Sequence, residues 1–255
     1  MDIATVIGLV LAILAIVGSI LSGGSLIAFI DVPSILVVGG GVIAAIFIKW
    51  PMDQIKIIAS IYMKSIFNTA VNPKVMIEEI QKLAETARRE SVFALEKVPV
   101  EDPFLKKAVT LAADNRPPEV ITSILQLEID SLVSRHKLGQ SIIQGIGDDG
   151  PAFGMIGTLI GLVIMLQNLS GGPDELGKSM AVAILTTFYG AVLANVFMGP
   201  VANKLKFYSE NEALVMNIIV AGVLGIVAGE NPRVIREKLD SFLPPAERQV
   251  EGGGE

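Results

Sequence analysis

The sequence predicts an all-α polytopic membrane protein with four transmembrane helices and a helical cytoplasmic domain. Of its 255 residues, 51% are hydrophobic and 18% are charged, whereas a soluble domain carries roughly 25% charged residues. Charged residues are absent from four long stretches, and no alternating run of β-branched residues indicates a strand. The apolar excess is therefore concentrated in helices that cross a membrane.

The four stretches without a charged side chain locate the spans. These stretches are residues 3–30, 32–48, 150–173 and 179–203. Because a spanning helix needs about 20 apolar residues, we expect spans near 3–22, 33–50, 151–169 and 179–203. A cleaved signal peptide is the alternative for the first stretch. It is disfavoured because the apolar run is too long and Asp2 precedes it where a signal peptide has basic residues.

The spans divide the chain into four parts. We expect transmembrane helices 1 and 2 in 1–50, a cytoplasmic helical domain in 51–148, transmembrane helices 3 and 4 in 149–203, and a cytoplasmic helical segment with a flexible tail in 204–255. Nineteen of the 20 Lys and Arg residues lie in 49–137 or 204–248. Since basic residues favour the cytoplasmic side of a membrane, both termini are expected in the cytoplasm.

One further apolar segment, 213–229, has 17 residues without a charge. A fifth crossing is the alternative, but it would place the basic residues after it outside the cell, against the charge rule. Asn217 and three glycines also make it a poor lipid-facing helix. We expect a buried helix packed against the cytoplasmic domain.

The cytoplasmic domain shows clear helix starts. Asn72-Pro73 combines a capping residue with proline at the first helical position, and Pro103 and the pair Pro117-Pro118 open two further helices. Between the first two helices lies a dense set of charges, Arg88, Arg89, Glu90, Glu96 and Lys97. These charges are either a solvated surface or a docking face for a charged protein.

Several function classes are excluded by composition. The pI near 5.0 argues against nucleic-acid binding. There is no cysteine and a single histidine, His136, so thiolate chemistry and a multi-histidine metal centre are excluded. The glycine clusters 39–41 and 147–150 lack the lysine of a phosphate-binding loop. We therefore expect no enzymatic activity and no cofactor.

The spans contain no Asp, Glu or His, although proton relays through membranes run through these residues. Either the chain forms no ion pathway, or another subunit supplies the carboxylate. The spans do contain Thr158 and Thr187, which either bond their own preceding helical turn or serve as oxygen ligands for an alkali cation. Pro151 is expected to open the third span, and Pro200 to kink the fourth.

These motifs together resemble the flagellar stator family MotA/PomA, in its sodium-driven form. The resemblance is carried by PAFGMIGTLIGLV (151–163), the run 181–205, ARRESVFALE (87–96), Arg135-His136 and GENPRVI (229–235). It implies a pentamer around a dimer of a single-span MotB/PomB partner, which supplies the membrane aspartate. It further implies that cation flow, Na⁺ with H⁺ as the alternative, drives torque on the rotor protein FliG in the bacterial inner membrane.

The resemblance also assigns roles to individual residues. Thr158, Thr186 and Thr187 match ion-pathway positions, with transient Na⁺ at Thr158 and Thr187. Pro151 and Pro200 match the coupling prolines. Arg88, Arg89 and Glu96 match rotor-contact positions, whereas Lys97 departs from an acidic residue found there in some members.

An envelope-transport energiser of the ExbB/TolQ class is the alternative function. Such proteins usually have three spans, with the large cytoplasmic loop after the first. Here the long polar segment follows the second span, which favours the stator interpretation.

Overall fold

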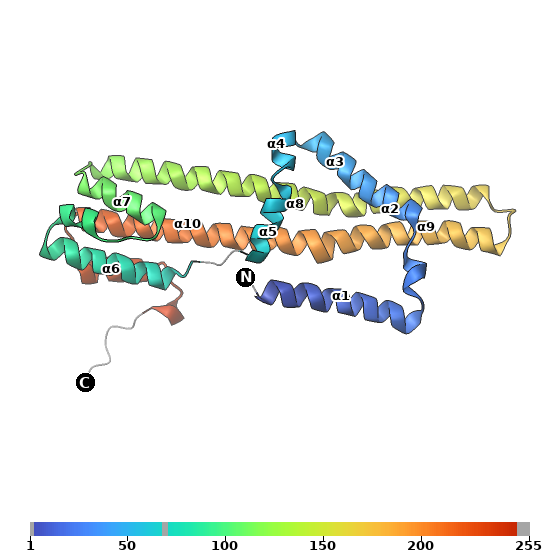
Figure 1. The fold of residues 1–255 in the computed structure, drawn as a ribbon, viewed down its shortest axis with the longest axis horizontal. Coiled ribbons are helices and arrows are strands. Elements are labelled where there is room, and N and C mark those ends of the chain that lie inside the picture. Colours follow the sequence, from blue (N-terminus) through green and yellow to red (C-terminus); the bar gives the residue numbers. More distant parts are fainter. Residues whose placement is uncertain (1–2, 68–70, 249–255) are drawn as a thin grey trace. The chain divides into compact units, whose positions relative to one another are not determined.

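The structure is a computed structural model that describes residues 3–67 and 71–248, and within these ranges it contains helices and no strand. The all-α fold class is therefore confirmed. The chain forms two compact units. The first combines Met1–Thr69 with Lys137–Lys206, and the second combines Ala70–His136 with Phe207–Glu255. Two helices, α8 (Pro118–Gln167) and α10 (Gly199–Val227), contribute residues to both units (Figure 1).

The first unit holds the four helical segments that are long and apolar enough to cross a membrane. The first is α1 (Ile3–Gly23). The second comprises α2 (Val32–Ile35), the π-helix η2 (Leu36–Gly40) and α3 (Gly41–Lys49), and it follows the short helix η1 (Leu26–Phe29). The third is the end of α8, and the fourth comprises α9 (Pro173–Val192), the π-helix η4 (Leu193–Met198) and the start of α10. The four expected spans are all found as helices.

Pro151 does not lie in the first turn of a helix, the position expected for a proline that opens the third span. Pro151 lies inside α8, which continues unbroken for 50 residues. An internal proline removes one backbone hydrogen bond, and α8 continues through this point in close contact with α9. A Cβ atom placed on Gly150 would lie 2.8 Å from the carbonyl oxygen of Gly190. The backbones of the two helices thus approach closely beside the proline.

Pro200 lies in the first turn of α10, directly after η4. The helical stretch runs without a break from Pro173 to Val227, so Pro200, which has no N–H, leaves one backbone bond within it unmade. The irregularity expected at Pro200 thus takes the form of a π-helical turn over Leu193–Met198, a recognised cause of helix bending.

A polar cluster joins the start of α2 to α9. The Asp31 side chain caps α2 by accepting from the backbone N–H of Ser34 at 2.9 Å. The Ser34 hydroxyl is placed to donate to the carbonyl of Val182 at 3.3 Å. The Tyr189 hydroxyl donates to the carbonyl of Phe29 and accepts from the backbone N–H of Asp31 at 3.1 Å. These bonds fix the second span against α9.

After α3 the chain forms two short helices that the sequence reasoning missed, α4 (Met52–Ile55) and α5 (Ile58–Phe67). Ile58 and Ile61 of α5 pack against the buried side chains of Ile143, Val201 and Ala202. Helix α5 therefore lies across the α8 and α10 segments of the first unit.

The second unit is built around one apolar core. It comprises α6 (Pro73–Arg89), η3 (Val92–Lys97), α7 (Pro103–Ala113), the start of α8, the end of α10, α11 (Pro232–Asp240) and η5 (Pro245–Glu247). The Asn72 side chain caps α6 at the N–H of Lys74, 3.0 Å away, and Asp102 caps α7 at the N–H of Leu105, 2.8 Å away. The predicted helix starts therefore follow from local capping.

The segment 213–229 lies in this core. Its side chains Val215, Ile218, Ile219 and Val223 are each no more than 3% exposed and pack with residues of α6, α7 and α11. Gly222 allows the close approach, because a Cβ atom there would lie 3.2 Å from Ile80 Cδ1. The segment is thus a buried helix of the second unit, as the sequence analysis expected.

An ion pair ties the end of α3 to α8. Lys49 Nζ lies 2.5 Å from Asp149 Oδ1, and the Asp149 side chain is 13% exposed against 45% for Lys49. Within the described part of the chain, the second carboxylate oxygen of Asp149 is buried without a hydrogen-bond partner. The positive charge of Lys49 is therefore the main group that compensates the buried negative charge of Asp149.

Replacing Lys49 should destabilise the first unit because it leaves this charge uncompensated. We expect Lys49→Met to lower the free energy of unfolding by about 1–3 kcal/mol. The double variant Lys49→Met/Asp149→Leu should recover most of the loss, since it removes both charges. Thermal unfolding of the purified proteins measures both effects. An unchanged melting temperature in Lys49→Met would contradict this role for the ion pair.

Stability of the second unit should depend on the charge of Glu79 on α6. Partial burial raises the pKa of Glu79 above 4.5, and the nearby carboxylates of Asp102 and Glu101 raise it further. The ionised form is thus less favourable in the folded state, a penalty that grows as the pH rises through the raised pKa. Glu79→Gln should raise the melting temperature at pH 8, and the gain should shrink as the pH falls towards 4.5. Glu78→Gln, on the exposed side of the same helix, is the control, and equal gains in both variants would rule out the burial argument.

Candidate functional site

The contact between α8 and α9 is made by small residues on both helices. A Cβ atom at Gly154 would lie 3.0 Å from the carbonyl oxygen of Thr186, and one at Gly161 would lie 2.7 Å from the backbone nitrogen of Ala183. No larger side chain fits at these positions. In a bilayer, where apolar packing alone gives little driving force, such close approach is what holds helices together. Figure 1 shows the two helices side by side.

This contact brings together the hydroxyl groups of Thr158 and Thr187. Their oxygens are 2.6 Å apart. The Thr158 hydroxyl also lies 3.0 Å from the carbonyl oxygen of Gly154 and 3.1 Å from that of Ala183. The Thr187 hydroxyl lies 3.5 Å from the same Ala183 oxygen. Thr158 is partly exposed and Thr187 is exposed, so the two hydroxyls open onto the surface of the helix pair.

Thr158 forms bonds both within its own helix and to the neighbouring helix. Its hydroxyl bonds the preceding turn of its own helix, the usual behaviour of a threonine in a span, and it also reaches the neighbouring helix. The result is a cluster of hydroxyl and carbonyl oxygens. Such hard, neutral oxygens are suitable ligands for an alkali or alkaline-earth cation.

Thr186 occupies a different position from the other two threonines. It is fully buried, and its hydroxyl bonds the carbonyl oxygens of Val182 and Ala183 in its own helix, at 2.9 and 3.0 Å. Its Cβ would lie 2.6 Å from a Cβ placed on Gly157. The structure therefore gives Thr186 a packing position between the helices.

The oxygen cluster contains no group that titrates near neutral pH. Between Asp149 and Asp174 the chain carries no charged side chain. Among residues 3–67 and 71–248, no group of three His, Cys, Asp or Glu residues is placed to hold a metal ion. The two threonines can thus coordinate a cation but cannot release or accept a proton at neutral pH.

The two prolines flank this region along the chain. Pro151 precedes Thr158 by about two helical turns of α8, and Pro200 begins α10 after the π-helix that follows α9. Both prolines are exposed. Each therefore lies within a long helical stretch, Pro118–Gln167 for Pro151 and Pro173–Val227 for Pro200.

The predicted rotor-contact residues lie at the end of α6 and on η3. Arg88 and Arg89 form the last turn of α6, and Glu96 belongs to η3. All three are exposed, and none forms an ion pair with another described residue. Leu95, 1% exposed, anchors η3 in the core. The three charged side chains therefore lie on a segment that is anchored to the core, and they remain available to contact another protein.

Phe93 lies among these charges and was missed by the sequence reasoning. Its side chain is 64% exposed. Buried partners surround Leu95 but not Phe93, although the two residues are close in sequence. An aromatic residue within a run of charges was the available signal, because aromatic and arginine side chains are enriched at protein interfaces.

The comparisons with known proteins agree over nearly the whole chain. Residues 96–218 match the MotA/TolQ/ExbB proton channel family. The chemotaxis protein PomA of Vibrio alginolyticus is 38% identical over 251 residues, covering 98% of this chain and 99% of that protein. The structure of C. jejuni MotAB matches with a TM-score of 0.88 at 26% identity, covering 99% of this chain and 100% of that chain. The flagellar MotAB stator complex from Bacillus subtilis matches with a TM-score of 0.86 at 31% identity, covering 95% of this chain and 96% of that chain.

The resemblance carried by the span motifs is thereby confirmed. The chain is a multi-pass membrane protein of a channel family and is not an enzyme. The chain belongs to the MotA/PomA family of flagellar motor stator proteins, within the wider MotA/TolQ/ExbB group.

Proposed function

We propose that this chain is the stator subunit that, with a MotB/PomB-type single-span partner, conducts cations and converts their flow into torque. The observation that carries the proposal is the pair of Thr158 and Thr187 hydroxyls, 2.6 Å apart on an accessible face. The solved relatives are MotAB complexes, which supports a second subunit of the MotB type. That subunit supplies the membrane carboxylate that the spans of this chain lack.

The transported cation is Na⁺ in this proposal. Two hydroxyl oxygens and the Ala183 carbonyl offer ligands of the kind that replace water around a dehydrated alkali cation. Thr186 supports the pair by packing and does not bind the ion. One charge crossing 100 mV releases about 2.3 kcal/mol, several times thermal energy, so each ion can bias one mechanical step.

The remaining parts of the proposal follow the family. Five copies surround two copies of the partner in the bacterial inner membrane, with both termini in the cytoplasm. Pro151 and Pro200 transmit the movement of the spans to the second unit. Arg88, Arg89 and Glu96 contact the rotor protein FliG, and the absence of internal ion pairs at these described side chains leaves them available for this contact.

The cation is tested by measuring flagellar rotation against external sodium in cells that carry this chain and its partner as their stator, at fixed pH and voltage. Rotation should rise and saturate with sodium. Thr158→Val should raise the sodium concentration for half-maximal speed by about tenfold, because one oxygen ligand is worth about 1.4 kcal/mol. The matched control is Thr122→Val, since Thr122 makes the same bond to its preceding turn, at 2.8 Å, but lies in the second unit.

Three results would contradict parts of this proposal. Rotation that ignores sodium and stops with a protonophore would make the ion a proton and the threonines structural. An equal loss in Thr122→Val would show a general effect of removing a helical hydroxyl. An assembled complex that never rotates a flagellum would favour the ExbB/TolQ-type function.

The torque face is tested separately from the ion pathway. Arg88→Glu and Glu96→Lys should each reduce stall torque severalfold while ion flux through the complex stays within about twofold, since mutating charges at the rim of an interface chiefly weakens the encounter with its partner. Arg116→Glu is the control, because Arg116 is also exposed in the second unit but lies outside the α6–η3 surface. Loss of flux in both test variants would place these residues in the channel structure instead.

A further inference from the structure

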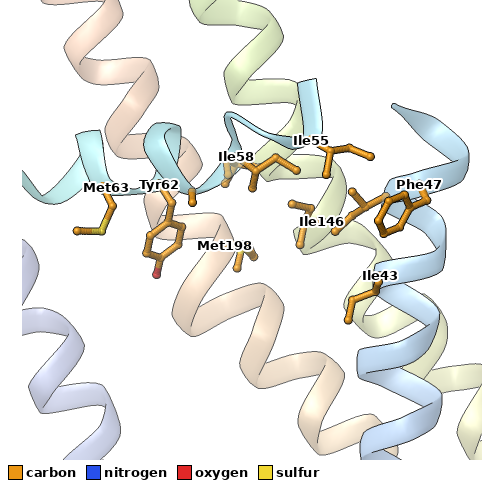
Figure 2. Close-up of a pocket in the computed structure, with 11 residues that line it drawn as sticks. Ile43, Phe47, Ile55, Ile58, Tyr62, Met63, Ile146 and Met198 are labelled. Atoms are coloured by element: carbon orange, nitrogen blue, oxygen red, sulfur yellow. The ribbon is translucent and has the colours of Figure 1, made fainter. Parts of the chain in front are cut away.

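The first unit contains an apolar groove beneath α5 that the proposed function does not use. The groove has a volume of about 590 Å³, within the range of roughly 300–1,000 Å³ typical of small-molecule sites. Figure 2 shows how it is formed. Ile43 and Phe47 extend from α3 on one side, Tyr62 and Met63 from α5 on the other, and Ile146 and Met198 lie between them.

The lining is apolar but open to the surroundings. Ile43 is 57% exposed, Phe47 54% and Met63 47%. Tyr62 contributes the polar end of its ring, and burial of this residue raises its pKa above 10.0. An exposed apolar surface of this size on a soluble protein would mark an interaction site. Here the groove belongs to the unit that contains the four membrane helices.

The position of the groove along α3 places it at the edge of the membrane. Helix α3 ends at Lys49, and Trp50 follows as the single tryptophan of the chain. Tryptophan and lysine are typical of the boundary between lipid tails and headgroups. The exposed residues Ile43 and Phe47 before Lys49 therefore face lipid tails, and the helices that follow lie at headgroup level.

Lysines lie close in sequence to the residues that line the groove. Residues 49–64 contain three lysines and one aspartate. Lys49 is paired with Asp149, and Lys56 forms only an exposed contact with Asp53, 3.3 Å away, which contributes little. Lys64 directly follows the lining residue Met63, is exposed, and forms no ion pair with any described residue.

Helix α5 presents its apolar groove-lining residues and its polar residues on different stripes. Its groove-lining residues Ile58, Ala59, Tyr62 and Met63 recur at helical spacing, and Ser60 and Lys64 lie four residues apart on a neighbouring stripe. A ligand that fits must therefore combine a long apolar chain with a negative headgroup. We infer that the groove binds an acyl chain of an anionic phospholipid, with Lys64 holding the lipid phosphate.

Trp50 provides a direct readout, because it packs on the cluster of Val42, Ile142 and Ile146 that borders the groove. The complex, with any partner tryptophans replaced by Phe, is placed in phosphatidylcholine bilayers that contain increasing fractions of phosphatidylglycerol with brominated acyl chains. Bromine near the groove quenches the Trp50 fluorescence. We expect quenching to saturate at a small fraction of the anionic lipid, and brominated phosphatidylcholine to require a much larger one.

One variant tests the apolar groove and another tests the lysine. Ala59→Phe should fill the groove and abolish the saturating phase, whereas Ser60→Phe, next to it and outside the lining, should not. Lys64→Gln should raise the half-saturating fraction by about fivefold, the change that corresponds to one Lys near an anionic surface. Lys178→Gln, on α9, is its control.

Either of two results overturns the inference. Equal quenching by both brominated lipids, in proportion to their bulk fraction, would show ordinary lipid contact without a site. Absence of quenching by both lipids would show that protein covers the groove, and disulfide formation between Ala59→Cys copies would identify a second copy as the occupant. Neither result depends on whether the stator turns a flagellum.

Discussion

The close contact between α8 and α9 determines the rest of the membrane unit. Gly154, Gly157 and Gly161 face the backbone and small side chains of Thr186 and Ala183, so the two helices meet without intervening side chains. This approach places the Thr158 hydroxyl within hydrogen-bond distance of the Ala183 carbonyl and of Thr187. The same contact continues to Gly150 and Gly190, beside Pro151. A side chain at any of these glycines would separate the threonines.

The features that the sequence predicted are those that depend on neighbouring residues in the chain. The spans follow from charge-free length, and the starts of α6 and α7 follow from caps at Asn72 and Asp102. The position of Pro151 was mistaken because a proline is by local rules a first-turn residue, whereas α8 begins much earlier, at Pro118. Helical spacing also could not separate Thr186 from Thr187, since their different surroundings depend on how α9 is rotated against α8.

In the second unit, unlike the first, most apolar residues are buried in one core and the surface is polar. Its core takes in nearly every apolar residue of α6, α7, α11 and the end of α10, which explains why 213–229 is too apolar for a surface helix and yet not a span. The polar residues are left for the outside. On η3, only Leu95 among residues 92–97 is buried, so the neighbouring charges and Phe93 stay at the surface while the backbone is fixed.

In the proposed ion pathway, the neutral chemistry of the oxygen cluster favours a carboxylate supplied by a second subunit. Hydroxyl and carbonyl oxygens replace part of the water around Na⁺, but they are neutral, and a cation without a counter-charge in a low-dielectric region is strongly unfavourable. The carboxylate of Asp149 cannot serve, because it is already paired with Lys49. A carboxylate from a partner helix on the open face of Thr158 and Thr187 would supply the charge, while the threonines supply the coordination. In this proposal the site is divided between two proteins, so either subunit alone provides only half of a pathway.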